Sequence, residues 1–382
     1  MARAILAREL GPSRAGCVDF ALASRADDED IRRLLRENPI PGDVSVSFER
    51  EPDYFADTAL PGELKQTIIA RDSAGLVGAG SCVVRNRFVN GVPRQVGYLA
   101  GLRLDARNAG RFDLLRRGYH FFHQLQIQSP ADYYFTSIAA DNERARRFLE
   151  RRLPGMPHYA FVGDFVTLLL PAARGTLSRA KPNRNELQAW APCIEEVVPR
   201  LNACNREHQF APCWAAPELF SLRQLGLQLD DFRFVCQSGR AVASAALWDQ
   251  RAFRQTVIRG YAPHLAASRP LLNALGRLLV WPRLPAVGEP LANALVSHLA
   301  VGPDDADSLI ALVAELRRTA ARRQLELLTF GFAANDPRLG TVRRNFRCRE
   351  YHSRFYCVSW PNVGGAAHEL DGRLLAPEVA LL

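Results

Sequence analysis

Residues 95–126 read QVGYLAGLRLDARNAGRFDLLRRGYHFFHQLQ, and this stretch decides the fold. An apolar run of strand length extends from Val96 to Leu104. Residues 105–110 have the composition of a turn, and apolar residues then recur with a helical period. The stretch therefore predicts a strand, a turn with arginine and glycine, and an amphipathic helix in direct succession.

The turn and the start of the helix together predict an anion site. The first turn of a helix has N–H groups without intrahelical partners, and the helix dipole makes this end positive. These groups would face the loop from Arg107 to Arg111, and Gly110 would let a ligand approach the backbone closely. A pyrophosphate would fit such a site.

The composition is that of a globular chain with an arginine-based positive charge. A length of 382 residues predicts two domains with ordinary cores. The formal net charge is +9, but lysine occurs only at positions 65 and 181, and no run of five basic residues occurs. Nucleic-acid binding is therefore not expected as the main function, and a polyanionic small molecule such as a nucleotide cofactor is favoured.

The cysteines and the N-terminus bear on the compartment. Eight cysteines show neither C-x-x-C nor metal-like spacing, so we expect reduced thiols and no metal site. The N-terminus lacks the apolar segment of a signal peptide, and no apolar run is long enough to span a membrane. The expectation is a cytoplasmic protein.

A repeated order of segments predicts a duplicated unit. The segments that have counterparts are a hairpin, a central strand and a late strand: 67–86 with 232–250, 95–104 with 292–301, and 133–142 with 325–336. The second copy is longer, and its extra segment is expected to hold an inserted helix. The predicted divisions are a first unit at 18–170, a linker at 171–186, a second unit at 187–360 and a flexible tail at 361–382.

The first half resembles a GNAT-superfamily acetyltransferase domain, and the whole chain resembles the tandem-GNAT proteins. The resemblance covers about residues 20–170 and rests on the element order, the strand LAGLRLD, the Arg-Asn-Ala-Gly turn and a D-N-x-x-A-x-x-F-L helix. It implies an α/β fold of the α+β type. Two tandem units are expected, each a mixed, mainly antiparallel sheet flanked by helices.

The resemblance also implies acetyl-coenzyme A or another acyl-coenzyme A as co-substrate, without a metal. The turn amides would hold the pyrophosphate, and the central strand would hold the thioester carbonyl. The candidate residues for this binding are Leu102, Arg103, Leu104, Arg107, Asn108, Ala109, Gly110, Arg111, Phe112 and Asn142. Two alternatives stay open, because Arg103 could instead cover the sheet and Asn142 could simply cap a helix. Phe112 departs from the family, which has a small residue there.

Three residues are candidates for proton transfer. Many relatives have a tyrosine seven positions after the asparagine as the acid, and this chain has Leu149 there. Tyr159 is the candidate replacement, with core packing as its alternative. Glu49 and Glu51 are the candidate bases, because a carboxylate near the acceptor would bind its ammonium group and could accept its proton. The alternative is a surface acidic loop.

The second unit departs from the pattern where the first one keeps it. Residues 302–307 follow its central strand, lack the Arg-x-x-Gly pattern and carry three carboxylates, which would repel a pyrophosphate. Only the first unit is therefore expected to bind coenzyme A. The second is expected to close the acceptor side or to build an interface, such as that of a homodimer.

The function implied by the resemblance is acyl transfer from acyl-coenzyme A to an amine. The acceptor would be a small molecule or a peptide, and the amine would attack directly within a ternary complex. Two alternatives remain. One is aminoacyl transfer from a charged tRNA by a related fold, and the other is a tandem-GNAT binding module without catalysis.

Overall fold

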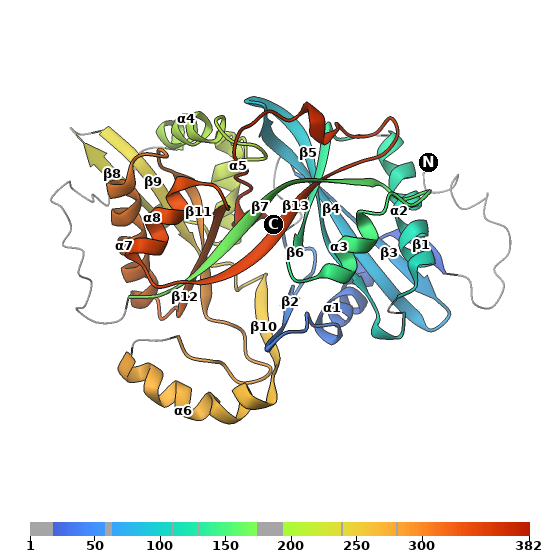
Figure 1. The fold of residues 1–382 in the computed structure, drawn as a ribbon, viewed down its shortest axis with the longest axis horizontal. Coiled ribbons are helices and arrows are strands. Elements are labelled where there is room, and N and C mark those ends of the chain that lie inside the picture. Colours follow the sequence, from blue (N-terminus) through green and yellow to red (C-terminus); the bar gives the residue numbers. More distant parts are fainter. Residues whose placement is uncertain are drawn as a thin grey trace.

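The computed structural model describes residues 18–57, 63–108, 110–128, 130–173, 194–237, 240–279 and 282–382. Within them, one sheet of eleven strands runs through the molecule (Figure 1). The strands lie in the order β1 (Asp19–Leu22), β3 (Leu64–Asp72), β4 (Gly75–Val89), β5 (Val92–Leu104), β6 (Tyr133–Ala139), β13 (Arg349–Ser359), β7 (His158–Pro171), β12 (Leu327–Ala333), β11 (Asn293–Ala300), β9 (Arg240–Trp248) and β8 (Phe232–Gln237). The helices are α1 (Asp28–Glu37), α2 (Phe112–Gln128), α3 (Glu143–Leu149), α4 (Ile194–Asn205), α5 (Ala216–Ser221), α6 (Pro263–Leu279), α7 (Ala306–Arg322) and α8 (Pro337–Asn345).

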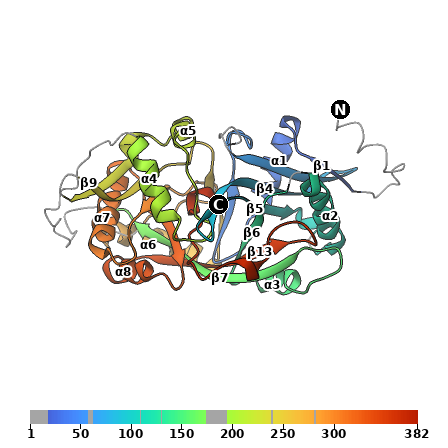
Figure 2. The same cartoon turned by 90° about the horizontal axis from the view of Figure 1, so that it is seen from above.

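Two parts of the sheet repeat one strand pattern. In the first half of the chain, which ends with β7, β5 is antiparallel to β4 and parallel to β6. In the second half, β11 is antiparallel to β9 and parallel to β12. Figure 2 shows the two halves side by side. The predicted α/β fold of tandem units, each mixed and mainly antiparallel, is confirmed.

Each half contributes its last strand to the sheet of the other half. Strand β13 pairs with β6 from Ser353–Ala139 to Val358–Tyr134, and β7 pairs with β12 along its C-terminal part. The two exchanged strands also pair with each other over most of their length. Main-chain hydrogen bonds therefore join the halves into one structure, and the strand alternation continues across the junction. Most of the predicted linker at 171–186 lies outside the described residues.

A second, two-stranded sheet also joins the halves. Strand β2 (Val44–Glu49) comes from the first half and pairs antiparallel with β10 (Gln255–Tyr261) from the second. Helix α6 follows β10 within the segment by which the second copy exceeds the first, and it lies apart from the main body (Figure 1). This sheet and helix form one wall of the space between the halves.

The expectation of a flexible tail from residue 361 is wrong. Val363, Leu375 and Ala380 are buried in apolar clusters, and Gln209 holds the segment by main-chain hydrogen bonds to Leu374 and Ala376 (2.8 and 3.0 Å). The apolar residues of this stretch have no period that would reveal a helix or strand. They fill gaps left by distant elements, which only the tertiary structure defines.

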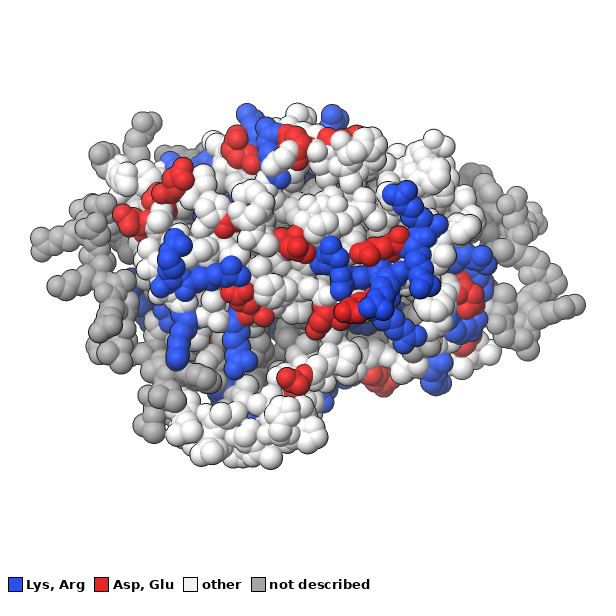
Figure 3. Space-filling model, viewed as in Figure 1, with Lys and Arg blue, Asp and Glu red and all other residues white. Residues whose placement is uncertain are grey.

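The surface carries both signs of charge. Figure 3 shows lysine and arginine side chains interspersed with aspartate and glutamate on one face. Oppositely charged side chains also form ion pairs; for example, Arg71 binds Asp27 and Asp30 (both 2.9 Å). None of the helices described is long and apolar enough to cross a membrane.

Candidate functional site

The central strand of the first half separates from its neighbour partway along. Strands β5 and β6 pair in parallel from Val96–Tyr133 to Tyr98–Phe135, and the ladder ends there. Beyond this point β5 continues to Leu104 with β4 as its ladder partner. A register shift marks a bulge, and Gly101 takes a positive φ of 65° within it. The result is a wedge-shaped gap bordered by the free edge of β5.

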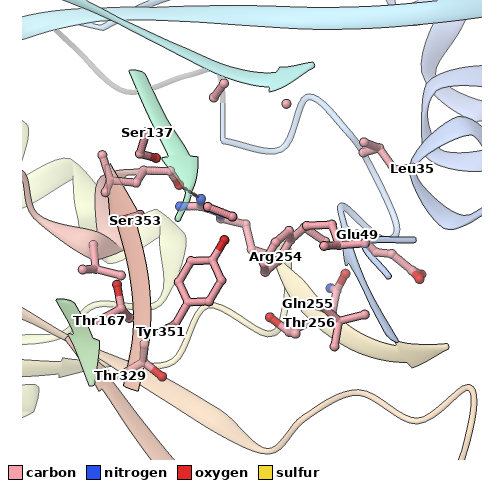
Figure 4. A pocket seen from close by; sticks show the side chains of 18 of the residues that line it. Leu35, Glu49, Ser137, Thr167, Arg254, Gln255, Thr256, Thr329, Tyr351 and Ser353 are labelled. Atoms are coloured by element: carbon pink, nitrogen blue, oxygen red, sulfur yellow. Dashed lines mark hydrogen bonds between the residues drawn. The ribbon is translucent and has the colours of Figure 1, made fainter. Parts of the chain in front are cut away.

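A cavity of about 1540 Å³ opens at this gap and extends into both halves. Its wall includes Leu102, Arg103 and Leu104 of β5, together with Asn142 at the start of α3. Strands from both halves line its centre, where Figure 4 shows Ser137, Tyr351 and Arg254 close together. Four of the predicted binding residues therefore line one cavity, and Arg103 takes the cavity-facing alternative.

The predicted pyrophosphate loop lies next to the cavity wall rather than in it. Arg107 and Arg111 each pair with a nearby carboxylate, Asp105 (2.9 Å) and Asp113 (2.7 Å). Asn108 ends a short turn, and Ala109 lies outside the described residues. The loop still leads directly into the N-terminus of α2, so its geometry keeps the strand, turn and helix order that an anion site needs.

A glycine and an aromatic stack shape the end of this loop, where α2 begins. Gly110 has a positive φ of 91°, and a Cβ atom there would lie 3.0 Å from Nη2 of Arg144. Phe112, which stands where relatives have a small residue, stacks on Phe148 with ring centroids 4.4 Å apart. The stack connects the N-terminus of α2 to α3 across the gap.

Asn142 caps a helix and also lies in the cavity wall. Its Oδ1 atom accepts a hydrogen bond from the main-chain N–H of Ala145 (3.2 Å), so it caps α3. It also lines the cavity beside the end of β6. The cap fixes the side chain at the gap.

The two predicted carboxylates have different surroundings. Glu49, the last residue of β2, is buried in the cavity wall and accepts hydrogen bonds from Ser47 and from Arg259 of β10 (Nε at 2.9 Å). Glu51 lies beyond the end of the strand, where it pairs with Arg32 and Arg36 of α1 and is not part of the cavity wall. The structure thus brings Glu49, and not Glu51, to the cavity.

Tyr159 lies in the cavity wall next to a second tyrosine. Its hydroxyl is hydrogen-bonded to that of Tyr119 from α2, and both rings belong to the apolar cluster around Leu149. Burial, together with the neighbouring Tyr119, holds the pKa of Tyr159 well above its ordinary value. The pair therefore places neutral phenols beside the position where relatives carry their acid.

Several cavity residues carry no local signal in the sequence. Tyr98 and Ser137 meet across the last paired rung of β5 and β6, with their oxygens 3.0 Å apart. Arg254 donates hydrogen bonds to the main-chain oxygens of Ala380 and Leu382, and burial lowers its pKa to about 10. These groups come from segments far apart in the chain, so no motif could have indicated them.

The equivalent gap in the second half is filled. Strands β11 and β12 also separate after three paired residues, and β11 has a bulge with His298 at a positive φ of 53°. A turn at Val379–Leu381 packs against both strands there. Trp214 stacks on the His298 ring (centroids 4.5 Å apart), and Glu378 accepts a hydrogen bond from the His298 N–H (3.2 Å).

The loop that follows β11 already uses one of its own carboxylates to cap the next helix. Asp305 caps α7 by accepting a hydrogen bond from the main-chain N–H of Ser308 (3.1 Å). The carboxylate occupies part of the helix N-terminus that an anion would need. The second half thus has the strands of the site but neither the space nor the anion loop.

Comparison with known proteins gives a structural answer only. The sequence matches no family model, and no curated protein is significantly similar to it in sequence. Solved structures with a similar fold include a GCN5-related N-acetyltransferase from Sphaerobacter thermophilus, with a TM-score of 0.57 and 13% identity over 90% of this chain and 96% of that chain. A tandem GNAT protein from the clavulanic acid biosynthesis pathway has a TM-score of 0.53 and 12% identity, with 90% and 98% covered.

The N-myristoyltransferase of Saccharomyces cerevisiae is similar to the same degree. Its structure with bound myristoyl-CoA and inhibitors has a TM-score of 0.58 and 13% identity, over 97% of this chain and 88% of that chain. These structural similarities extend over both halves. They agree with the repeated strand pattern and with the open gap between β5 and β6. The chain therefore has the fold of the tandem GNAT proteins.

Proposed function

We propose that the protein transfers an acyl group from acyl-coenzyme A to an amine, and that only its first half binds the coenzyme. The observation that carries the proposal is the contrast between the two gaps. The gap between β5 and β6 opens into the cavity, whereas its counterpart between β11 and β12 is filled by the turn at Val379–Leu381. The pantetheine arm of coenzyme A needs an open gap between two strands, and of these two gaps only the one between β5 and β6 is open.

The free edge of β5 suits the thioester carbonyl. Backbone N–H groups around Leu102 lie at the bulge, beyond the last rung shared with β6. Such donors stabilise the negative charge that develops on a carbonyl oxygen during attack by an amine. The helix N-terminus at Phe112 would take the pyrophosphate, as the loop geometry suggests.

The chemistry asks the protein to move two protons. The amine nitrogen bonds to the thioester carbonyl carbon, the carbon–sulfur bond breaks, and the coenzyme leaves as a thiolate. We assign the proton for that thiolate to the Tyr159 and Tyr119 pair, whose phenols stay neutral at ordinary pH. We assign acceptance of the amine proton to Glu49, the one acidic side chain among the described residues of the cavity wall.

The length of the acyl group is open to direct measurement. Acetyl-coenzyme A is the simplest donor. Apolar side chains of α2, including Leu114, Leu115 and Phe122, line the first-half end of the cavity and could also accept a longer chain. Release of free thiol should be compared for acetyl-, octanoyl- and myristoyl-coenzyme A with a panel of primary amines.

The experiment that tests the proposal combines binding with turnover. A ligand at 100 times its dissociation constant adds about 2.7 kcal/mol to stability, so a binding donor should raise the melting temperature clearly. Amine-dependent release of coenzyme A, with the acylated amine found by mass spectrometry, is the expected result. Absence of both a thermal shift and thiol release with every donor at millimolar concentration would refute the proposal. A shift with aminoacyl-tRNA alone would favour the aminoacyl-transfer alternative.

A further inference from the structure

The cavity continues from the gap into the second half, and its charged wall is strongly one-sided. Among the described residues of the wall are eight arginines and a single acidic side chain, Glu49, which already pairs with Arg259. Four of these arginines, at positions 283, 317, 347 and 349, lie in the second-half branch. Three of the eight, at positions 50, 251 and 283, pair with carboxylates that lie outside the wall. The wall itself still has an excess of positive charge, which favours an anionic ligand.

Two of the four carry the argument. Arg317 of α7 donates from Nε to the main-chain oxygen of Pro171 (2.8 Å), and its guanidinium lies 5.3 Å from the centroid of the Phe346 ring. Arg349 is the first residue of β13, and its side chain lines the cavity. Within the described part of the chain, neither arginine forms an ion pair with a carboxylate.

The surroundings of Arg317 destabilise the charged form of its guanidinium group. Burial and the neighbouring Arg318 lower the pKa of Arg317 below its ordinary value. A guanidinium whose Nε is anchored on a carbonyl still has its terminal N–H groups for a carboxylate or phosphate. A bound anion would compensate the charge.

The floor of the branch presents hydroxyl groups. Thr167 and Tyr351 lie opposite each other on β7 and β13, and Thr329 lies on the neighbouring strand β12 (Figure 4). Thr329 is only 9% exposed, and its Oγ1 atom has no hydrogen-bond partner within the described residues. An unpaired buried hydroxyl is costly, which points to a polar ligand atom at this position.

The spacing along β13 sets the length of the ligand. Ser353 pairs with Ala139 at the end of β6, next to the gap, while Arg349 stands on the same face of β13 four residues away. At about 3.4 Å per residue, the two positions are about 14 Å apart. The second half also contributes apolar residues to the cavity wall, including Ile258 of β10, Leu272 of α6 and Leu284.

We propose that the acceptor is an elongated amine with an anionic group at its far end, and that Arg317 and Arg349 bind that group. The amine of the acceptor lies at the gap beside Ser353, and its apolar middle part lies between β7 and α6. Thr329 donates a hydrogen bond to a polar atom of the acceptor. This inference rests on the proposed acyl transfer and adds the chemical class of the acceptor.

The test compares matched acceptors that differ in charge and length. Aminoundecanoate has a terminal carboxylate on a long spacer, its primary amide lacks the charge, and glycine lacks the spacer. The wild-type protein should have a KM for aminoundecanoate at least tenfold below the KM for the amide and for glycine. Equal KM values for the acid and the amide would overturn the proposal.

The variants Arg317→Gln and Arg349→Gln locate the effect. Each should raise the KM for aminoundecanoate at least tenfold and leave the KM for the amide unchanged. Arg318→Gln is the matched control, because Arg318 neighbours Arg317 on α7 but pairs with Glu315 (2.8 Å) outside the cavity wall. Arg349 is exposed, so its variant stays informative if Arg317→Gln fails to fold.

Two further measurements separate this proposal from the proposed function. The affinity for acetyl-coenzyme A, measured by calorimetry, should be unchanged in Arg317→Gln and Arg349→Gln. Loss of this binding would mean that the two arginines bind the coenzyme, and this result would overturn the inference. If no acceptor turns over, binding of aminoundecanoate and its amide to the coenzyme-loaded protein decides, and equal affinities contradict the proposal. Failure of the wild-type protein to bind any acyl-coenzyme A refutes the proposed function itself.

Discussion

At the scale of single residues, two glutamates separated by one position have unlike environments. Glu49 ends β2 and is fixed in the cavity wall by Arg259, a residue of the other half. Glu51 lies past the strand end and pairs with α1. The sequence predicted Glu49 and Glu51 as candidate bases, with a surface acidic loop as the alternative. It could not choose between the two, because the choice depends on the pairing of β2 with β10.

Glutamine substitutions at these two positions form a matched pair. Glu49→Gln should lower kcat/KM at least tenfold, about 1.4 kcal/mol of transition-state free energy, because the carboxylate that we assign to the amine is lost. Glu51→Gln should leave both kcat and KM within twofold. Steady-state kinetics with a saturating donor, on proteins with comparable melting curves, decides this, and equal effects of the two changes would contradict the assignment.

The tyrosine pair gives a second residue-scale prediction. Tyr159→Phe keeps the ring but removes the proton donor, so kcat should fall at least tenfold while the affinity for acyl-coenzyme A is kept. Because the pKa of Tyr159 is raised, the phenol keeps its proton as pH rises, and the wild-type kcat should show no loss from this group between about pH 7 and pH 9. Unchanged kcat in Tyr159→Phe would leave Tyr159 a packing residue.

At the scale of elements, the sequence was informative where local order decides the structure. The strand at 96–104, the turn and the helix beginning at Phe112 could be predicted from period and turn composition, and so could the repeat in the second half. The exchange of β7 and β13 could not, because either strand would satisfy its alternation in either half. The packed tail was missed for a related reason, since its burial depends on the gap that it fills.

Two ionisable groups are buried where the Val379–Leu381 turn fills the second gap: Glu378, directly before the turn, and His298 of β11. Glu378 faces His298, Arg85 and Arg87; burial raises its pKa from 4.5 to about 7 and lowers the pKa of His298 to about 3. The stability that the protonated Glu378 contributes is present below pH 4.5 and is lost as pH rises through 7. His298 contributes in the opposite sense, because its neutral form loses stability as pH falls from 6.5 toward 3.

Glu378→Gln should therefore change the pH profile of stability. The free energy of unfolding of the wild-type protein, relative to that of the variant, should decrease by about 3 kcal/mol between pH 4.5 and pH 8, as the pKa shift of Glu378 requires. Urea unfolding at several pH values, with Glu369→Gln on the exposed part of the tail as control, measures this difference. A difference independent of pH would show that Glu378 is not held in its protonated form.

At the scale of the whole molecule, the two halves repeat one strand pattern but differ at the gap beside the central strand. Both halves keep a bulged central strand that separates from its parallel neighbour. The first gap opens into the cavity, and the second holds the Val379–Leu381 turn. In the function that we propose, the first half therefore takes the coenzyme and the second supplies walls of the acceptor site. The three carboxylates at 302–307 indicated this asymmetry in the sequence, although the filled gap gives the stronger reason.

The number of coenzyme molecules bound per chain tests this account most directly. Titration calorimetry with acetyl-coenzyme A should give one equivalent. The stoichiometry should fall to zero in Ala139→Trp, because an indole at the end of β6 would occupy the first gap. Circular dichroism should confirm that this variant is folded. Two equivalents per chain, or one equivalent retained in Ala139→Trp, would contradict the claim that the first gap alone holds the coenzyme.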